Sequence, residues 1–533
     1  MKVPVELETA ESRGRRALAW IILAAGLVLP FAIRLHRLDL PLERDEGDYA
    51  YGAQLILAGV PLYKEFYTLR LPGIYDVYAL MMTVLGSSTA GIHLGLAIWT
   101  TASAIAVFAI GKRLFGTLAG AAAGLAFALL SASEGALGLA GHATHFVVLP
   151  AAIGCLLLRP DPPRGIACIA AGLSFGIAIL MKQHAMTIAI FGAAYLVWLA
   201  WDAAPKQRAA RIALYGAGVA TPYLLVCLNA WRESALGPFW FWTTRYALEY
   251  AGAESVADPL GNLRDGVASV TGSNLPIWLL AAAGAVHLFA RPHARDARIF
   301  LTGLAIASAL AVCPGLHFRP HYFIVLFPAV ALLAAVGLAD SAVRAAKIPW
   351  KWLGAFALAA VLSVASEWER FFTMSSSDVS RQVYGANPFL ESVEIARYVR
   401  DHSDPGDRIA VLGSEPQIYF YAERRSAARY PHMFALFEPH ALAREMQEEM
   451  IQEIEVARPR WIILIHAGQS WLMSERSDRT LVEWGPRYLD AHYALDGVVE
   501  ISSYGTSTYR WSVPAGTKAP IVPDYVLVFR RTG

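Results

Sequence analysis

Two adjacent carboxylates, Asp45 and Glu46, precede three side chains that can donate hydrogen bonds to an anion: Lys64, Tyr67 and Arg70. A carboxylate within hydrogen-bond reach of a hydroxyl group can remove its proton as a general base. Lysine, arginine and tyrosine donors can neutralise a phosphate that leaves as an anion. These residue types therefore suit a substitution in which a hydroxyl attacks an anomeric carbon and a phosphate departs.

The carboxylate pair has other interpretations. Asp45 also suits the N-cap of a helix that begins at Glu46, because an aspartate side chain can accept hydrogen bonds from the first amides of a helix. Both roles can hold at once. Glu46 is a candidate to orient Asp45, to bind a divalent metal ion, or to remain solvated. No histidine or third ligand is close in sequence, so a metal site stays uncertain, with Asp45 and Glu46 as its candidate ligands.

The basic residues have two interpretations as well. Lys64 and Arg70 flank apolar sequence, where basic side chains often reach toward lipid headgroups. Pro72 and Gly73 constrain the chain just after Arg70. This constraint favours a binding role for Arg70.

A second basic group lies in the loop HFRPHYF, which contains His317, Arg319 and His321. Pro320 restricts Arg319 to an extended backbone, and a planar guanidinium suits phosphate. The loop therefore predicts a phosphate clamp. A metal site is disfavoured here because neither cysteine nor carboxylate accompanies the histidines.

Further candidates are ionisable residues at the ends of apolar segments, because such groups usually face a cavity and not lipid. For each of them, a structural ion pair or a surface position is the simpler explanation. These candidates are Glu134, His142, Lys182 and Arg245.

The composition limits the class of protein that positions these groups. Of 533 residues, 56% are hydrophobic and 17% charged, whereas soluble domains are about a quarter charged. The sequence therefore predicts a polytopic membrane protein. The net charge of +2 provides no basic field for a nucleic-acid partner. The four cysteines lie in apolar segments without CxxC spacing, which is typical of buried hydrophobic residues.

A membrane-spanning helix needs about 20 mostly apolar residues. The segment 71–86 is apolar but short and contains Asp76, so we expect a re-entrant or interfacial helix there. About eleven spans are predicted, at 17–35, 90–111, 117–133, 143–159, 165–181, 185–201, 210–230, 274–290, 298–314, 321–339 and 350–366.

Basic residues in the connections predict the orientation, because they mark the cytoplasmic side. The pattern places residues 1–16 in the cytoplasm, and the loop 36–89 and the C-terminal residues outside it. The basic connections are 13–16, 111–113, 159–164, 205–211, 291–298 and 343–347.

From residue 371 the chain becomes polar. A small extracytoplasmic α/β domain is predicted over 371–533, after a transmembrane domain over 17–370. The sequence GSEPQ at 413–417 matches neither GxGxxG nor a P-loop, so no nucleotide site is expected. The expected elements are helices at 388–402 and 438–458 and strands at 408–413, 461–466 and 525–529.

The stretches RDEGDYAYGAQLILAGVPLYKEF, HFRPHYFIVLFP and IARYVRDHSDPGDRIAVLGSEPQIYFYAERRSAARY resemble glycosyltransferase family 39 of the GT-C class. This family includes protein O-mannosyltransferases and lipid A aminoarabinose transferases. The resemblance implies a GT-C fold, a donor sugar on polyprenyl phosphate, and inverting transfer outside the cytoplasm. It maps the catalytic aspartate onto Asp45 and a phosphate-binding basic residue onto Arg70. Many relatives have lysine directly before the proline, whereas here Leu71 separates Arg70 from Pro72.

The sequence thus predicts a bacterial inner-membrane glycosyltransferase that moves a sugar from a polyprenyl-phosphate donor to a hydroxyl of a lipid, glycan or protein. A divalent metal ion is the one cofactor under consideration. A transporter or flippase, or a non-catalytic subunit that binds lipid-linked sugar, is the alternative. Transporters usually show repeated halves, and no repeat is visible here. The expected roles are base for Asp45, orienter or metal contact for Glu46, and phosphate ligand for Arg70, Lys64, Tyr67, Arg319, His321 and His317.

A reporter enzyme fused after Arg381 tests the predicted orientation. We expect alkaline phosphatase to be active at this position, because the domain that follows is predicted outside the cytoplasm. A fusion after Arg113, in a predicted cytoplasmic connection, is the control and should be inactive. An inactive fusion after Arg381, with a cytoplasmic reporter active at the same position, would overturn the arrangement.

Overall fold

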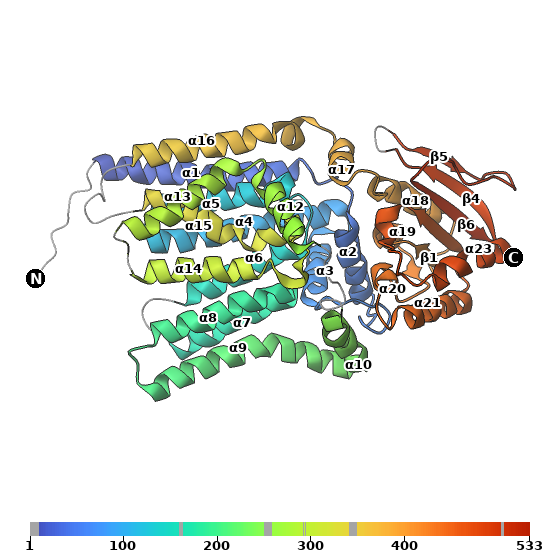
Figure 1. Cartoon of the computed structure of the whole chain (residues 1–533), viewed down its shortest axis with the longest axis horizontal. Coiled ribbons are helices and arrows are strands. Elements are labelled where there is room, and N and C mark those ends of the chain that lie inside the picture. The colour runs from blue at the N-terminus through green and yellow to red at the C-terminus, as the bar shows by residue number, and fades with distance from the viewer. Residues whose placement is uncertain are drawn as a thin grey trace, which may run out of the picture. The chain divides into compact units, whose positions relative to one another are not determined.

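The computed structural model describes residues 10–158, 164–249, 258–291, 293, 295–339, 349–502 and 506–532. The chain packs into two compact units, each made of segments that are distant in sequence (Figure 1). Within the described residues, unit 1 comprises Met1–Leu38, Ala90–Leu228 and Val256–Thr373, and unit 2 comprises Asp39–Thr89, Asn229–Ser255 and Met374–Gly533. Parts of the predicted cytoplasmic segments lie outside the described residues, namely 1–9, 159–163, 292, 294 and 343–347.

Unit 1 is a bundle of helices (Figure 1). Short turns of 3-10 helix connect several of them, at η1 (Glu134–Ala136), η2 (Gln183–Ala185), η4 (Pro314–Leu316), η5 (Pro320–Val325) and η6 (Val336–Leu338), and a π-helical turn, η7 (Glu369–Thr373), follows the last. The α-helices are α1 (Ala10–Leu35), α4 (Thr89–Phe115), α5 (Thr117–Ala132), α6 (Ala143–Leu157), α7 (Gly165–Met181), α8 (Met186–Leu199), α9 (Pro205–Arg232), α12 (Pro259–Thr271), α13 (Leu275–Ala290), α14 (Arg295–Leu310), α15 (Phe327–Ala335) and α16 (Trp350–Ser366).

Helix α5 forms the centre of unit 1 and packs against α1 and α15. Its sequence is apolar on every side, and nearly all of its residues are buried, as expected for a helix without a polar face. Small residues permit close approach: a Cβ atom at Gly120 would lie 2.6 Å from the carbonyl oxygen of Phe108 in α4. Such small-residue contacts are typical of helix packing in membranes.

Three helices of the described chain are long and apolar enough to cross a membrane: Gly14–Leu35, Thr89–Phe115 and Pro205–Arg232. The bent pair α12 and α13, with an angle of 104°, makes a fourth if it forms one span. The remaining predicted spans also coincide with helices, but these are shorter. The helical nature of the segments is therefore confirmed, and the count of eleven spans stays a prediction.

Unit 2 combines a small mixed sheet with helices from three parts of the chain. Its N-terminal part is α2 (Arg44–Leu57) and α3 (Gly73–Leu85), and its middle part is α10 (Leu236–Trp240) with the π-helical turn η3 (Phe241–Tyr246). The C-terminal helices are α17 (Ser376–Tyr384), α18 (Phe389–Asp401), α19 (Gln417–Ala422), α20 (Phe434–Phe437), α21 (Ala443–Ala457), α22 (Gly468–Trp471) and α23 (Thr480–His492).

The sheet has six strands in the order β2-β1-β3-β6-β4-β5. The pairs β1–β2 and β1–β3 are parallel, and the pairs β3–β6, β6–β4 and β4–β5 are antiparallel. The strands are β1 (Arg408–Leu412), β2 (Arg425–Ser426), β3 (Trp461–His466), β4 (Tyr493–Glu500), β5 (Thr508–Trp511) and β6 (Tyr525–Arg531).

The predicted C-terminal α/β domain is confirmed in outline. The predicted helix 388–402 corresponds to α18, and the strands predicted at 461–466 and 525–529 correspond to β3 and β6. The helix predicted at 438–458 is wrong at its start, because α20 ends at Phe437 and α21 begins at Ala443. Pro439 lies in the break, where it lacks an amide hydrogen and disfavours helix in the residue before it.

Helix α2 packs directly on α19. A Cβ atom at Gly47 would lie 2.6 Å from the backbone nitrogen of Gln417. The ring of Tyr51 stacks on Tyr419 with centroids 5.0 Å apart, and its hydroxyl accepts a hydrogen bond from the Ser426 amide at 2.8 Å. The residues 39–89, which were assigned to the transmembrane domain in the sequence analysis, thus fold together with C-terminal residues.

Replacement of Gly47 by alanine should destabilise unit 2. The added methyl group would collide with the α19 backbone, and overpacking of this kind costs about 1–3 kcal/mol. The matched control is Gly354→Ala in α16, where nothing lies within 4 Å of the new Cβ and the gain in helix propensity is about 0.5–1 kcal/mol. Thermal unfolding of the purified chain in lipid nanodiscs measures both variants. A Gly47→Ala midpoint at or above that of the parent would contradict the close contact.

Candidate active site

Asp45 and Glu46 lie in the first turn of α2, so the N-terminal cap of this helix fixes their positions. Glu43 is the N-cap residue: its side chain accepts a hydrogen bond from the Glu46 amide at 2.9 Å, and the Glu46 side chain accepts one from the Glu43 amide at 3.4 Å. The interpretation of Asp45 as the N-cap is therefore wrong, because Glu43 already forms a reciprocal capping box. Glu46 is fully buried and not solvated. Its position gives no support to a metal site made by Asp45 and Glu46.

Arg70 bridges two carboxylates that lie one turn apart on α2. Its Nη2 donates to Asp45 Oδ1 at 2.6 Å, and its Nη1 donates to Asp48 Oδ2 at 3.0 Å. Asp48 is fully buried, whereas the side chains of Asp45 and Arg70 are 23% and 26% exposed. The guanidinium thus neutralises a buried charge and fixes a second carboxylate that remains accessible.

Asp48 has further partners. The Tyr75 hydroxyl donates to Asp48 Oδ2 at 2.8 Å, and His432 Nε2 lies 3.1 Å from Asp48 Oδ1. Burial alone would lower the pKa of Arg70, but Asp48, Tyr49 and Asp45 outweigh it and raise this pKa well above its usual value. Arg70 is therefore a permanent cation that is shared between two carboxylates. The sequence has no signal for His432, because its contact with Asp48 joins distant segments.

Tyr67 belongs to a different cluster of unit 2. Its ring lies 4.9 Å from that of Trp242 and 5.1 Å from that of Tyr430, and its hydroxyl donates to Glu449 Oε1 at 3.4 Å. Burial, followed by the nearby Glu449, raises the pKa of Tyr67, so its hydroxyl stays protonated. Lys64 is exposed. The side-chain contacts of Tyr67 are thus separate from the bridge that Arg70 makes.

Within unit 1, the structure brings together two histidines that were treated as separate groups in the sequence analysis. The rings of His142 and His321 are stacked, with centroids 4.1 Å and planes 10° apart, and both residues are buried. The Thr144 hydroxyl donates to the carbonyl oxygen of His321 at 2.8 Å. The pair forms because α6, which begins just after His142, packs against η5.

The residues around Tyr322 extend this histidine pair. Lys182 Nζ lies 3.8 Å from the centre of the Tyr322 ring, and the ring of His321 lies 4.8 Å from it. Arg319 is the N-cap residue of η5, and both Arg319 and His317 are partly exposed. Lys182, Tyr322 and the two stacked histidines therefore form a cluster at η5, and the phosphate clamp stays a prediction.

The remaining candidates have ion-pair partners. Glu134 lies 3.5 Å from Arg370 Nε, and the buried Glu367 pairs with the same arginine. In unit 2, Arg245 pairs with Glu249 at 3.8 Å, and both side chains are exposed. These contacts agree with the structural interpretation of Glu134 and Arg245.

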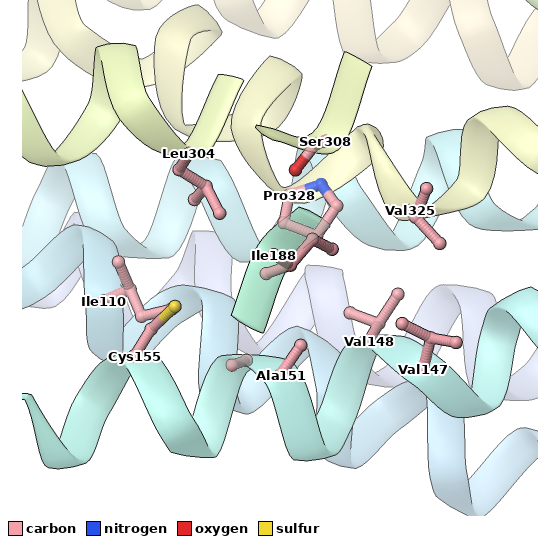
Figure 2. A pocket seen from close by; sticks show the side chains of 11 residues that line it. Ile110, Val147, Val148, Ala151, Cys155, Ile188, Leu304, Ser308, Val325 and Pro328 are labelled. Atoms are coloured by element: carbon pink, nitrogen blue, oxygen red, sulfur yellow. The ribbon is translucent and has the colours of Figure 1, made fainter. Parts of the chain in front are cut away.

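Unit 1 also contains a small apolar pocket between α4, α6, α8, α14 and the segment from η5 to α15 (Figure 2). Its wall is almost entirely hydrocarbon, apart from one hydroxyl and one thiol. The lining residues are Ile110, Val147, Val148, Ala151, Ala152, Cys155, Ile188, Leu304, Ser308, Val325 and Pro328.

Comparisons with known proteins agree with this architecture. The family model described as dolichyl-phosphate-mannose-protein mannosyltransferase matches residues 72–231. ArnT from Cupriavidus metallidurans, solved with undecaprenyl phosphate, has a similar structure, with a TM-score of 0.58 and 14% identity over 97% of this chain and 97% of that chain. A search of curated protein sequences finds no match.

The second similar protein is the archaeal oligosaccharyltransferase AglB from Archaeoglobus fulgidus, solved with an inhibitory peptide and a dolichol-phosphate. Its TM-score is 0.51 at 13% identity, covering 94% of this chain and 75% of that chain. The Archaeoglobus fulgidus oligosaccharyltransferase with Zn and sulfate gives a TM-score of 0.52 at 15% identity, covering 92% and 72%. The chain therefore shares its fold with ArnT and with the archaeal oligosaccharyltransferase. The family-model match over residues 72–231 agrees with the resemblance of the sequence to glycosyltransferase family 39.

Replacement of Arg70 by alanine should destabilise unit 2, because it leaves the buried Asp48 without its guanidinium partner. Removing one member of a buried ion pair costs about 3 kcal/mol or more. The control is Arg245→Ala, which breaks an exposed pair and should cost at most about 1 kcal/mol. Thermal unfolding in nanodiscs measures both. Equal midpoints for the two variants would show that Arg70 does not carry the charge of Asp48.

Proposed function

We propose that this chain is a membrane glycosyltransferase that transfers a sugar from a polyprenyl-phosphate donor to a hydroxyl group of a lipid, glycan or protein. The GT-C fold and the match to a mannosyltransferase family model support this class. Two proteins of similar fold were solved with dolichol-phosphate or undecaprenyl phosphate.

The observation that carries the mechanism is the ion pair between Asp45 and Arg70. A general base must be ionised and must be held on a rigid element near the hydroxyl that it activates. Asp45 lies in the first turn of α2, is partly exposed, and accepts a hydrogen bond from a permanent cation. These features suit a base better than those of Glu46, whose carboxylate serves the helix cap.

In the proposed reaction, Asp45 accepts the proton of the acceptor hydroxyl while the hydroxyl oxygen attacks the anomeric carbon. The bond between that carbon and the phosphate oxygen breaks on the opposite face, and its electron pair leaves with the polyprenyl phosphate. The configuration at the anomeric carbon is inverted. Arg70 is a positioning residue in this scheme, because its Nη2 donates to Asp45 and its Nη1 donates to Asp48.

The donor phosphate needs other cations. Within unit 1, our candidates are Lys182 and His321, whose side chains contact the Tyr322 ring, and Arg319, which is the N-cap residue of η5. Lys64 stays a candidate from the sequence. We further propose that transfer occurs outside the cytoplasm, as the basic connections predict.

The replacement Asp45→Asn should abolish transfer, because asparagine keeps the shape of the side chain but cannot accept the proton. The loss of a general base lowers the rate about 10²–10⁴-fold. The assay uses undecaprenyl phosphate bearing mannose, glucose or aminoarabinose, with membranes from a deletion strain as the acceptor. Binding of undecaprenyl phosphate should be unchanged.

The control for this experiment is Glu65→Gln, which removes an exposed carboxylate from the same segment. It should transfer sugar at the rate of the parent chain. Transfer by Asp45→Asn at the parental rate would show that Asp45 is not the base. Loss of undecaprenyl-phosphate binding in Asp45→Asn would move Asp45 from proton transfer to donor binding.

A further inference from the structure

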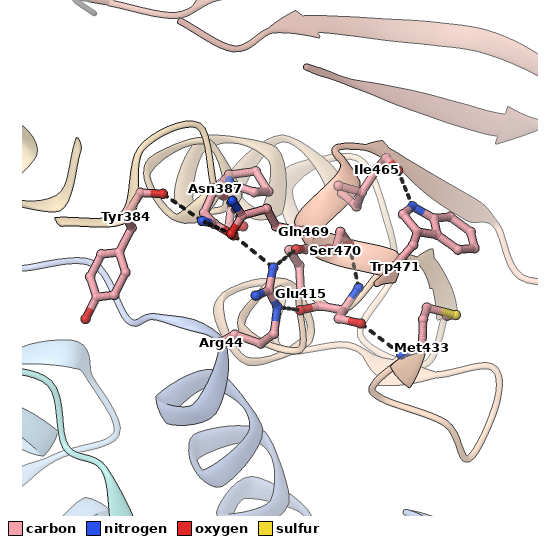
Figure 3. Close-up of polar contacts among 12 residues, drawn as sticks. Arg44, Tyr384, Asn387, Glu415, Met433, Ile465, Gln469, Ser470 and Trp471 are labelled. Carbon is pink, nitrogen blue, oxygen red and sulfur yellow. Dashed lines mark hydrogen bonds and ion pairs between the residues drawn. The ribbon is translucent and has the colours of Figure 1, made fainter. Parts of the chain in front are cut away.

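The residues GSEP at 413–416 lie between β1 and α19, and this loop contacts Arg44, the first residue of α2 (Figure 3). Arg44 Nε donates to the carbonyl oxygen of Ser414 at 2.6 Å, and Arg44 Nη2 donates to Glu415 Oε1 at 2.9 Å. The same Nη2 donates to Asn387 Oδ1 at 3.1 Å. A planar guanidinium held at several points fixes both the position and the rotation of the chain that carries it.

The partner of Arg44 is a fully buried carboxylate. Glu415 has no exposed side-chain surface, and Arg44 is 14% exposed. The guanidinium also lies 5.5 Å from the ring centre of Phe389 and 5.6 Å from that of Phe434. A charge buried in this way is strongly disfavoured without its counter-ion, so the pair resists any displacement of Arg44.

The loop that holds Glu415 is itself rigid. The Ser470 hydroxyl donates to Glu415 Oε2 at 2.6 Å and accepts a hydrogen bond from the Ser414 amide at 2.8 Å. The Met433 amide donates to Ser414 Oγ at 2.9 Å. A side chain at Gly413 would lie 2.4 Å from Ile465 and 2.6 Å from Glu415 Oε2. The loop is therefore held by β3, α22 and the residues before α20.

We propose that Arg44 and Glu415 are positioning residues for Asp45, and that the C-terminal domain thereby sets the geometry of the base. This inference rests on the proposed function of Asp45. Asp45 is the residue after Arg44, so it is fixed from two sides: through Arg44 to the Glu415 loop, and through its own carboxylate to Arg70. Both contacts are made within unit 2.

The expected effect on kcat follows because proton transfer is sensitive to the position of the base. A displacement of a catalytic group by about 1 Å can lower the rate about 10²-fold. Arg44→Ala and Glu415→Gln should therefore lower kcat about 10²-fold, while KM for the lipid-linked donor stays the same. Arg44→Lys keeps the charge but loses the planar fork, so its kcat should lie between those of the parent and Arg44→Ala.

The chain offers a matched control with the same chemistry. Arg381 in α17 pairs with Glu391 in α18, and Glu391 accepts a hydrogen bond from Ser507. Glu391 is fully buried and Arg381 is 10% exposed. Arg381→Ala removes a comparable buried pair from unit 2 without touching α2. A general loss of stability should affect this variant as much as Arg44→Ala.

The experiment measures kcat and KM with whichever of undecaprenyl-phosphate mannose, glucose or aminoarabinose the parent chain uses. It also measures hydrogen exchange of the backbone amides of residues 44–57 in the full chain. Support for the proposal is a lower kcat, an unchanged KM and faster exchange in Arg44→Ala and Glu415→Gln, with parental values in Arg381→Ala. The proposal is overturned if both Arg44→Ala and Glu415→Gln keep the parental kcat. It is also overturned if Arg381→Ala lowers kcat as much as they do.

The variant Asp45→Asn separates this inference from the function on which it rests. If Asp45→Asn is inactive while Arg44→Ala and Glu415→Gln retain full kcat, the base stands and the positioning role is wrong. If Asp45→Asn transfers sugar at the parental rate, the base is wrong and the positioning role falls with it.

Discussion

A buried carboxylate needs a counter-ion, and this constraint determines the contacts of the first half of α2. Asp48 and Glu415 are both fully buried, and each is paired with an arginine, Arg70 for the first and Arg44 for the second. Removing one partner of a buried ion pair costs more free energy of folding than the intact pair contributes. The two arginines therefore hold the start of α2 in its position. Asp45 lies between these two fixed points and has little freedom of its own.

The candidate base depends on residues that are remote in the sequence. An isolated helix of the length of α2 is marginal in water, so most of its stability must come from tertiary packing. That packing is supplied by α19 and the loop before it, through the close contact at Gly47 and the stacked pair of Tyr51 and Tyr419. The segment 39–89, which carries Asp45, and the C-terminal residues thus belong to one compact unit, although most helices of unit 1 lie between them in the sequence.

Arg70 and the basic residues near η5 make separate sets of contacts. Arg70 was expected to bind the donor phosphate, yet its donors are directed to Asp45 and Asp48. The cationic and aromatic cluster at η5 in unit 1 is a separate feature, formed by Lys182, Tyr322 and the stacked histidines. A cation that is shared with two carboxylates has little charge left for a phosphate, so these contacts favour a positioning role for Arg70 in the proposed reaction.

The sequence by itself determined the features that depend on local pattern. Apolar runs predict the helices of unit 1, alternating polar and apolar segments predict α18, β3 and β6, and the acidic motif draws attention to Asp45. Only the tertiary structure decided the partners of these residues. The cap at Glu43, the bridge through Arg70, the contact of His432 with Asp48 and the ion pair of Glu415 with Arg44 have no periodic signal. Pairing of buried charges joins residues across the fold, and such pairing is fixed by three-dimensional packing and not by neighbours in the chain.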